Sequence, residues 1–155
     1  MKGFFLADFF SGDGGVAKAA RRLGVDARCW GTRNGDAFDL TKASVQRRAR
    51  QDVAAGCLRA AMLAPPCTSF GSAGNRSFPA RSAERPWGKP AAELTEKQRE
   101  RVAAGNTAFR ASLALLKTLR RARAPWIFER PQASFASKTP ELEKLSRCPR
   151  VHQRT

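Results

Sequence analysis

The sequence predicts a parallel, three-layer α/β domain, and three observations lead to this class. Short apolar runs, which are typical of buried strands, alternate with segments whose apolar residues have helical spacing. Three of the runs are followed at once by residues suited to chemistry: a glycine loop, a thiol and a carboxylate. If each run is a parallel strand, these groups lie at the carboxyl edge of one sheet, where open α/β sheets bind ligands.

The first strand and helix are predicted over residues 3–24. Residues 3–9 form an apolar run, and Gly24 is a natural stop for the helix expected over residues 14–23. The apolar residues of that helix at helical spacing are Val16, Ala19, Ala20 and Leu23. Residues 27–30 predict a weak second strand.

The second helix and the third strand follow. Thr41 is expected to be the N-cap of a helix whose apolar face carries Val45, Ala49 and Val53. Residues 57–64 are nearly all apolar, as in a strand covered on both faces, and two prolines end that run.

The second half of the chain begins with an irregular segment. Residues 68–94 are rich in Ser, Gly, Pro and Arg and predict a mobile loop. Thr95 and Gln98 form a capping box. The stripe of the helix that follows consists of Val102, Asn106, Phe109, Leu113 and Leu116. Residues 126–129 predict a strand, and residues 136–155 a weakly structured tail of a single domain spanning 1–155.

The charge of the chain indicates its partners. The formal net charge is +16, from 29 Lys and Arg against 13 Asp and Glu. A surface of this kind attracts nucleic acid, although an arginine-rich composition alone also produces basic faces. No apolar stretch reaches the roughly 18 residues of a membrane span, and the apolar start is too short for a signal peptide.

The cysteines indicate a reducing compartment. Cys29, Cys57, Cys67 and Cys148 form no CxxC pair, and His152 is the single histidine. We therefore expect no metal site. Reduced thiols fit an intracellular protein, nuclear if the organism is a eukaryote.

The glycine loop is the first candidate binding element. Gly12, Gly14 and Gly15 lie between a strand and a helix, where the backbone can approach a ligand and helix N–H groups can meet an anion. The loop alone fits a dinucleotide, S-adenosylmethionine or a tight turn. Asp39 is a second carboxylate, either meeting an adenine edge or preceding the Thr41 cap.

Cys67 and Glu129 are the candidate catalytic residues. Cys67 follows Pro65-Pro66, which stiffen the chain before it. It is either a nucleophile, activated by cations such as Arg76 and Arg81, or an inert thiol. Glu129 ends an apolar strand, where it either pairs with Arg130 or donates, when protonated, to a ring nitrogen.

These segments together resemble the DNA cytosine-5 methyltransferase family over roughly residues 4–135. Asp8-Phe9-Phe10-Ser11-Gly12-Asp13-Gly14-Gly15 is similar to the family's cofactor loop. Pro65-Pro66-Cys67 is similar to its nucleophile segment, and Glu129-Arg130-Pro131 stands where the family has Glu-Asn-Val or Glu-Asn-Pro. Three motifs in the family's order are more specific than any one of them.

The resemblance implies a Rossmann-like methyltransferase fold and an activity. Cys67 would attack C6 of a flipped cytosine, and Glu129 would hold its N3 edge. S-adenosyl-L-methionine would supply the methyl group to C5. The residues implied to bind this cofactor are Asp8, Phe10, Gly12, Gly14, Gly15, Asp39 and Pro65. Those implied to contact DNA are Arg76, Arg81, Arg85 and Arg130.

The chain also departs from the family pattern. Residues 30–34 hold no acid for the cofactor ribose, Arg130 replaces the usual Asn, and Gly71 stands where Ser is common. The family's Gln-x-Arg-x-Arg segment and target recognition region are not visible. One alternative is a non-catalytic DNA-binding remnant, similar to methylase-like domains of mobile-element polyproteins. Another is a different Rossmann-like enzyme, which leaves the Cys67 and Glu129 motifs unexplained.

Overall fold

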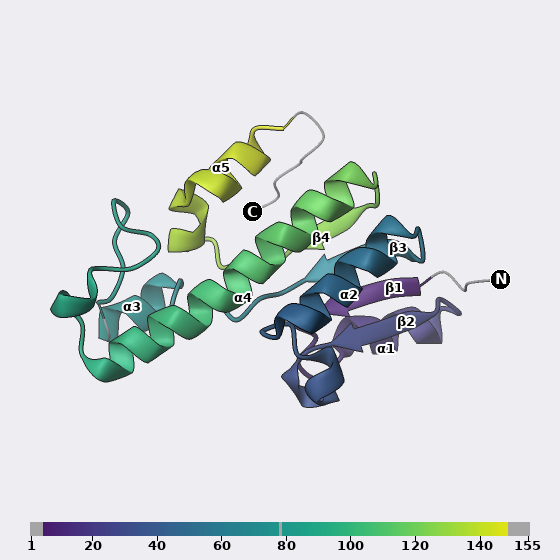
Figure 1. Ribbon diagram of the computed structural model, residues 1–155, viewed down its shortest axis with the longest axis horizontal. Coiled ribbons are helices and arrows are strands. Elements are labelled where there is room, and N and C mark those ends of the chain that lie inside the picture. The colour runs from purple at the N-terminus through teal and green to yellow at the C-terminus, as the bar shows by residue number, and fades with distance from the viewer. Residues whose placement is uncertain (1–4, 78, 149–155) are drawn as a thin grey trace. The chain divides into compact units, whose positions relative to one another are not determined.

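The computed structural model describes residues 5–77 and 79–148 (Figure 1). Gly3, Phe4 and His152, which the sequence analysis singled out, lie outside these residues. The chain divides into two compact units. The sheet unit comprises Met1–Pro65 and Arg110–Glu129, and the small unit comprises Pro66–Phe109 and Arg130–Thr155. Each unit is described by itself, and the single domain expected from sequence stays a prediction.

The sheet unit contains four parallel strands in the order β2-β1-β3-β4, which confirms the α/β class. The strands are β1 (Phe5–Phe9), β2 (Ala27–Trp30), β3 (Leu58–Leu63) and β4 (Trp126–Phe128). Their last residues are in register, because Phe9 pairs with Trp30 and Leu63, and Leu63 pairs with Phe128. The four strands predicted from apolar runs are all present, each shortened by no more than two residues within the described chain.

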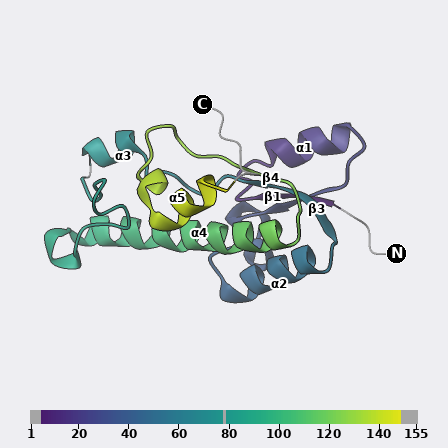
Figure 2. The same cartoon turned by 90° about the horizontal axis from the view of Figure 1, so that it is seen from above.

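Helices cover both faces of the sheet (Figure 2). Helix α1 (Gly15–Arg22) lies on one face, and α2 (Ala43–Ala54) lies on the other with residues 110–121 of α4 (Glu96–Arg121). Two 3-10 helices, η1 (Thr32–Asn34) and η2 (Asp36–Phe38), connect β2 to α2. The fully buried apolar side chains of this unit include Phe5, Phe9, Val53, Leu63, Leu115, Leu116 and Leu119.

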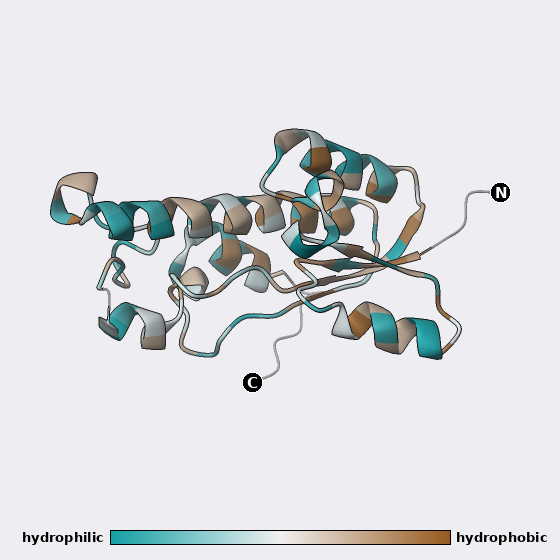
Figure 3. Ribbon diagram, turned by 90° about the horizontal axis from the view of Figure 1, so that it is seen from below, coloured by the Kyte–Doolittle hydropathy of each residue, from teal (hydrophilic) through white to brown (hydrophobic). Residues whose placement is uncertain are grey.

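Helix α1 packs differently from the sequence expectation. Ala17 is its fully buried residue, whereas Val16 is 40% exposed and Leu23, the residue after the helix, is 82% exposed. The apolar stripe predicted for this helix is therefore wrong. The reason is local: the carboxylate of Asp8 in β1 accepts the backbone N–H of Ala17 at 3.1 Å, which brings the side of the helix with this small residue onto the sheet. Figure 3, which views the molecule from below Figure 1, shows both hydrophilic and hydrophobic residues along α1.

Helix α2 confirms one expectation and corrects another. Val45, Ala49 and Val53 are buried, as their spacing predicts, and Gly56 follows the helix with a left-handed φ of 69°. The N-cap is Lys42 rather than Thr41, and no side chain caps the helix.

The small unit holds more regular structure than we expected. Within residues 68–94, where we expected a mobile loop, α3 (Ser72–Ser77) and η3 (Ala91–Glu93) form. Within residues 136–148 of the expected weak tail, η4 (Phe135–Lys138) continues into α5 (Pro140–Ser146), whose Leu142 and Leu145 are buried. The expectation of a weakly structured tail is corrected for residues 136–148, where Pro140 stands at the first turn of α5 and two leucines three residues apart are buried. The mobility of residues 68–94 stays a prediction.

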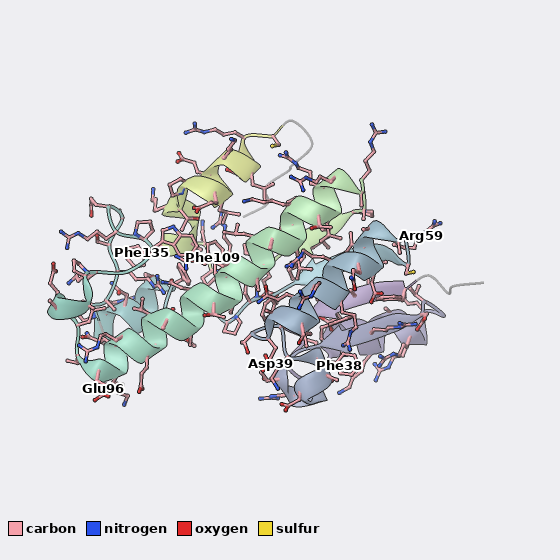
Figure 4. The ribbon with its side chains drawn as sticks, viewed as in Figure 1. Phe38, Asp39, Arg59, Glu96, Phe109 and Phe135 are labelled. Carbon is pink, nitrogen blue, oxygen red and sulfur yellow. The ribbon has the colours of Figure 1, made fainter. Side chains whose placement is uncertain are left out.

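The core of the small unit is aromatic. The ring centroids of Phe70 and Phe109 lie 4.9 Å apart, and those of Trp87 and Phe109 lie 5.4 Å apart. Figure 4 labels Phe109 on α4.

The capping box at the start of α4 is confirmed, since Gln98 N–H donates to Thr95 Oγ1 at 3.3 Å and Thr95 N–H donates to Gln98 Oε1 at 2.9 Å. No helix in the described part of the chain is long and apolar enough to cross a membrane.

Candidate active site

The strand order places a topological switch point between β1 and β3. From β1 the chain crosses through α1 to β2 on one side, and it later returns through α2 to β3 on the other side. Ligands of open α/β sheets bind outside the carboxyl ends of the strands at such a point. The glycine loop follows β1, Pro65 follows β3, and Glu129 follows β4.

Backbone hydrogen bonds hold these segments side by side at the carboxyl edge. The N–H of Ala64 donates to Phe9 O at 3.2 Å, and the N–H of Glu129 donates to Leu63 O at 2.9 Å. Pro65 is half-buried and Glu129 is exposed. The glycine loop and Glu129 therefore start from the same sheet edge, with the end of β3 between them.

The glycine loop turns through left-handed backbone conformations. Phe10, Gly12 and Gly14 have φ values of 58°, 51° and 70°. A Cβ on Gly14 would stand 2.9 Å from Cys29 Sγ, so this residue has neither the φ nor the space for a side chain. Cβ atoms on Gly12 and Gly15 would meet nothing within 4 Å. The loop thus leaves open space in front of two glycines at the start of α1.

Asp8 lies beneath the loop. It is 3% exposed, and burial raises the pKa of its carboxyl, although the N–H of Ala17 and the charge of Arg21 oppose that rise. Its bond to Ala17 joins β1 to the first turn of α1. Asp8, expected among the cofactor-binding residues, thus has an intramolecular partner and a role in building the loop.

Two contacts join the glycine loop to the segment after β2. Arg33 forms an ion pair with Asp13, and Asn34 Nδ2 donates to Ser11 Oγ at 3.0 Å. The N–H of Ser11 also donates to Trp30 O at 3.1 Å. The carboxyl ends of β1 and β2 consequently form one connected surface.

Asp39 stabilises the turn that precedes α2. Its Oδ1 accepts from the N–H of Thr41 at 2.9 Å and from Thr41 Oγ1 at 2.7 Å. The backbone hydrogen bond from Thr41 is the main cause that lowers the pKa of the Asp39 carboxyl. Figure 4 labels Asp39 and its neighbour Phe38 on the segment between β2 and α2. Of the two roles left open for Asp39, the structure shows the turn.

Trp30 is a residue that sequence reasoning missed. It ends β2, is 2% exposed, and packs edge-on against Phe38 with the guanidinium of Arg48 4.9 Å from its ring centroid. Its indole N–H is buried with no hydrogen-bond partner among the described residues. A tryptophan in a weak strand gave no signal of this environment.

Cys67 lies on a compact turn of the small unit. Its carbonyl oxygen accepts from the N–H of Phe70 at 3.0 Å and of Gly71 at 2.7 Å. The next carbonyl, Thr68 O, accepts from Arg101 Nη2 at 2.8 Å. The residue is exposed and its thiol is free. The Cys67 thiol is therefore accessible from solvent.

Arg81 holds the chain just beyond this turn. It is 2% exposed, and its guanidinium lies 3.7 Å from the Phe70 ring centroid. Nε donates to Ser69 O at 2.9 Å, Nη2 to Ser69 Oγ at 3.0 Å, and Nη1 to Pro86 O at 2.7 Å. Further bonds reach Asn106 Oδ1 and Val102 O. The expected phosphate contact of Arg81 is therefore corrected: its donors are used inside the unit.

The other expected DNA-contacting arginines are more accessible. Arg76 is exposed on α3. Arg85 is exposed and pairs with Glu93 at 2.9 Å. Arg130 is half-buried, and its Nη1 lies 3.4 Å from Pro131 O.

The carboxyl edge also provides a test of fit for S-adenosyl-L-methionine. A Cβ at Gly12 or Gly15 would meet nothing within 4 Å, so the backbone there is open to approach, and the segments at this edge contain the acids Asp13, Asp36, Asp39 and Glu129. Residues 31–35 supply no carboxylate for a ribose, and Asp36 pairs with Lys42 at 2.9 Å. Of the parts of this group, the open backbone at Gly12 and Gly15 suits the amino-acid end.

Comparison with known proteins assigns no family. No protein-family model, curated protein or solved structure matches the chain. Among residues 5–77 and 79–148, no group of three or more His, Cys, Asp and Glu side chains is placed to hold a metal ion.

Proposed function

We propose that this chain is a DNA cytosine-5 methyltransferase-like domain that uses Cys67 as its nucleophile and S-adenosyl-L-methionine as its methyl donor. One observation carries the proposal: the glycine loop, Pro65 and Glu129 follow β1, β3 and β4 at one carboxyl edge, and Cys67 comes two residues after Pro65 in the chain. The three motifs that resemble this enzyme family thus begin at the sheet edge where α/β proteins bind their ligands.

The proposed chemistry assigns Cys67 and Glu129 distinct steps. The Cys67 thiolate adds to C6 of a cytosine rotated out of the duplex, which makes C5 electron-rich. The Glu129 carboxyl hydrogen-bonds the N3 edge and stabilises the charge that develops on the ring. After C5 has accepted a methyl group and lost its proton, Cys67 leaves from C6 and the aromatic ring is restored.

The cofactor role falls to the β1–α1 connection. S-adenosyl-L-methionine, when bound, supplies the methyl group. Gly12 and Gly15 give its amino-acid end access to the backbone, and Gly14 fixes the turn. Phe10, Pro65 and Asp39 border the same edge from the ends of β1, β3 and the segment before α2.

A methyl-transfer assay tests this proposal. The purified chain is incubated with duplex DNA and S-adenosyl-L-methionine labelled in its methyl group, beside the variants Cys67→Ala and Cys148→Ala. Transfer that is lost in Cys67→Ala and retained in Cys148→Ala supports the proposal. Equal transfer by all three proteins contradicts it.

A second candidate, a DNA-binding remnant without catalysis, is favoured by one observation. Residues 31–35, directly after β2, hold no carboxylate for a ribose. This candidate predicts salt-sensitive DNA binding without heat of binding for S-adenosyl-L-methionine in calorimetry. A cofactor titration that saturates at one molecule per chain excludes it.

A further inference from the structure

The two edges of the sheet unit carry opposite charge. The segments at the carboxyl edge, residues 10–15, 31–42, 64–65 and 129, contain four acidic and two basic residues, a net charge of −2. The described segments at the amino edge, residues 21–28, 54–59 and 119–126, contain seven arginines and one acid, Asp26, a net charge of +6. The basic charge of this unit is therefore concentrated opposite the candidate active site.

The topology gathers these arginines at one edge. In a parallel α/β unit each connecting helix runs back along the sheet, so helices end where strands begin. The ends of α1, α2 and α4 accordingly meet the starts of β2, β3 and β4 (Figure 1). Four adjacent strands span about 15 Å at a spacing of about 4.8 Å. Figure 4 labels Arg59 at this edge.

Two of these arginines, Arg21 and Arg28, form contacts within the sheet unit itself. Arg21 donates through Nε and Nη2 to Ala27 O, at 3.0 and 2.5 Å, and so fastens the end of α1 to β2. The guanidinium of Arg28 lies 4.1 Å from the centroid of the Phe5 ring. These two side chains have structural roles, whatever binds outside.

Three arginines remain available to a partner. Arg22, Arg121 and Arg123 are exposed, and none of them forms an ion pair with a described residue. Arg22 ends α1, whereas Arg121 and Arg123 lie at the end of α4, so they stand at two different helix ends of the same edge. Cations near helix C-termini are favourable, but that effect acts within the last turn and does not require this number of charges.

We propose that the amino edge of the sheet unit is a second DNA-binding surface, one that holds the phosphate backbone without reading sequence. Duplex DNA carries one charge per about 1.7 Å of axis, or about nine charges over 15 Å, which matches an arginine-dense edge of this width. DNA is the favoured partner because the edge combines high charge density with guanidinium groups. The surface lies beyond the proposed function and does not depend on Cys67.

Salt-dependent binding to a 24-base-pair duplex tests this surface. The test protein is the full chain with Arg22→Gln, Arg121→Gln and Arg123→Gln. Each lost phosphate contact lowers the slope of log K against log salt by about one, so the triple variant loses about two to three. By the same relation its affinity at 0.1 M salt falls a few hundredfold.

Two further triple variants complete the design. Lysine at the same three positions keeps the charge and is expected to retain the wild-type slope. Arg47→Gln, Lys138→Gln and Lys144→Gln remove three exposed charges elsewhere and are expected to leave the slope within about one of the wild type. Equal slopes for the two glutamine triples overturn the proposal, as does a lysine triple that binds like the glutamine triple at the edge.

Competition distinguishes DNA from an acidic protein. Unlabelled duplex is expected to displace labelled duplex from the wild type far better than poly-glutamate at the same charge concentration. Poly-glutamate that competes equally well overturns the assignment to DNA. The variant Cys67→Ala is expected to retain the full salt slope. A negative result in the methyl-transfer assay therefore does not contradict DNA binding at the amino edge.

Discussion

At the scale of single residues, Arg81 joins several segments of the small unit through its buried guanidinium group. It is 2% exposed, and it donates hydrogen bonds to Ser69, Pro86, Val102 and Asn106. Burial without a described carboxylate partner lowers its pKa to about 10, which leaves it charged at neutral pH. Its positive charge is balanced by carbonyl and hydroxyl dipoles.

Replacing Arg81 is expected to be costly. Arg81→Met keeps the apolar stem and leaves several buried acceptors without donors, for a loss of about 2–4 kcal/mol in the free energy of unfolding. Urea denaturation of the variant measures the loss. Arg85→Met is the control: Arg85 pairs with Glu93 in solvent, where an ion pair contributes less than about 1 kcal/mol. Similar losses for both variants would contradict the role of Arg81.

Asp8 gives a prediction that depends on pH. Its folded-state pKa is raised, chiefly by burial, so the folded protein holds this proton more tightly than the unfolded chain, whose value is 3.8. The stability that Asp8 contributes is fully present below pH 3.8 and is lost as pH rises through the folded pKa. Each unit by which the pKa is raised corresponds to about 1.4 kcal/mol.

The variant Asp8→Asn isolates this effect, because asparagine keeps an acceptor for the Ala17 N–H and does not titrate. We expect the wild type to gain unfolding free energy relative to Asp8→Asn as pH falls from 7 to 4. Parallel unfolding curves at both pH values test the prediction. A difference that is independent of pH, or that moves toward the variant, is the contrary result.

Sequence alone could place these residues along the chain but could not assign their partners. Arg81 stands in a segment without periodicity, so nothing in its neighbours indicated that Ser69 and Asn106 would surround it. The interpretation of Arg81 as a phosphate contact failed for this reason. Which of the two roles Asp39 plays depends on a hydrogen bond to Thr41 that composition does not reveal.

At the scale of elements, the β1–α1 connection depends on glycine at one position and tolerates a side chain at the next. Gly14→Ala combines a φ of 70° with a Cβ 2.9 Å from Cys29 Sγ, so we expect a loss of about 2 kcal/mol or more. Gly15→Ala faces open space at the first helical position, so its expected change is within about 1 kcal/mol. Thermal unfolding compares the two variants, and equal losses would count against this geometry.

The elements that could be predicted were those with strong local signals. The capping box of Thr95 and Gln98 placed the start of α4, and Gly56 placed the end of α2. The contact face of α1 could not be predicted, because in a helix of eight residues one hydrogen bond from the Ala17 N–H to Asp8 outweighs the apolar pattern. Helix α5 was missed although Pro140 and Leu142 mark it, because a seven-residue helix repeats its pattern only once.

At the scale of the whole molecule, the distribution of charge over the structure cannot be derived from length and composition. A net charge of +16 predicted an affinity for nucleic acid without saying where. The sheet unit carries acids at its carboxyl edge and arginines at its amino edge. In the two proposals made above, the acidic carboxyl edge suits a cationic cofactor and the basic amino edge suits DNA phosphates.

The proposed methyl transfer requires Cys67 and Glu129, which follow the neighbouring strands β3 and β4 along the chain, to act on one cytosine. The alternation of apolar runs was enough to predict the parallel sheet and the segments at its carboxyl edge. It was not enough to predict the small unit that follows Pro65, because its fold depends on contacts between distant residues such as Phe70 and Phe109.

Covalent trapping tests this requirement for Cys67 and Glu129 most directly. The chain is incubated with S-adenosyl-L-methionine and duplex DNA in which 5-fluorocytosine replaces cytosine, so that loss of the C5 substituent is blocked and the thiol stays attached to C6. The account predicts a denaturation-resistant adduct whose peptide mass maps to Cys67, and far less of it in Glu129→Gln. Contradiction would be the absence of any adduct under conditions where the chain binds the duplex, or an adduct that maps to Cys29, Cys57 or Cys148.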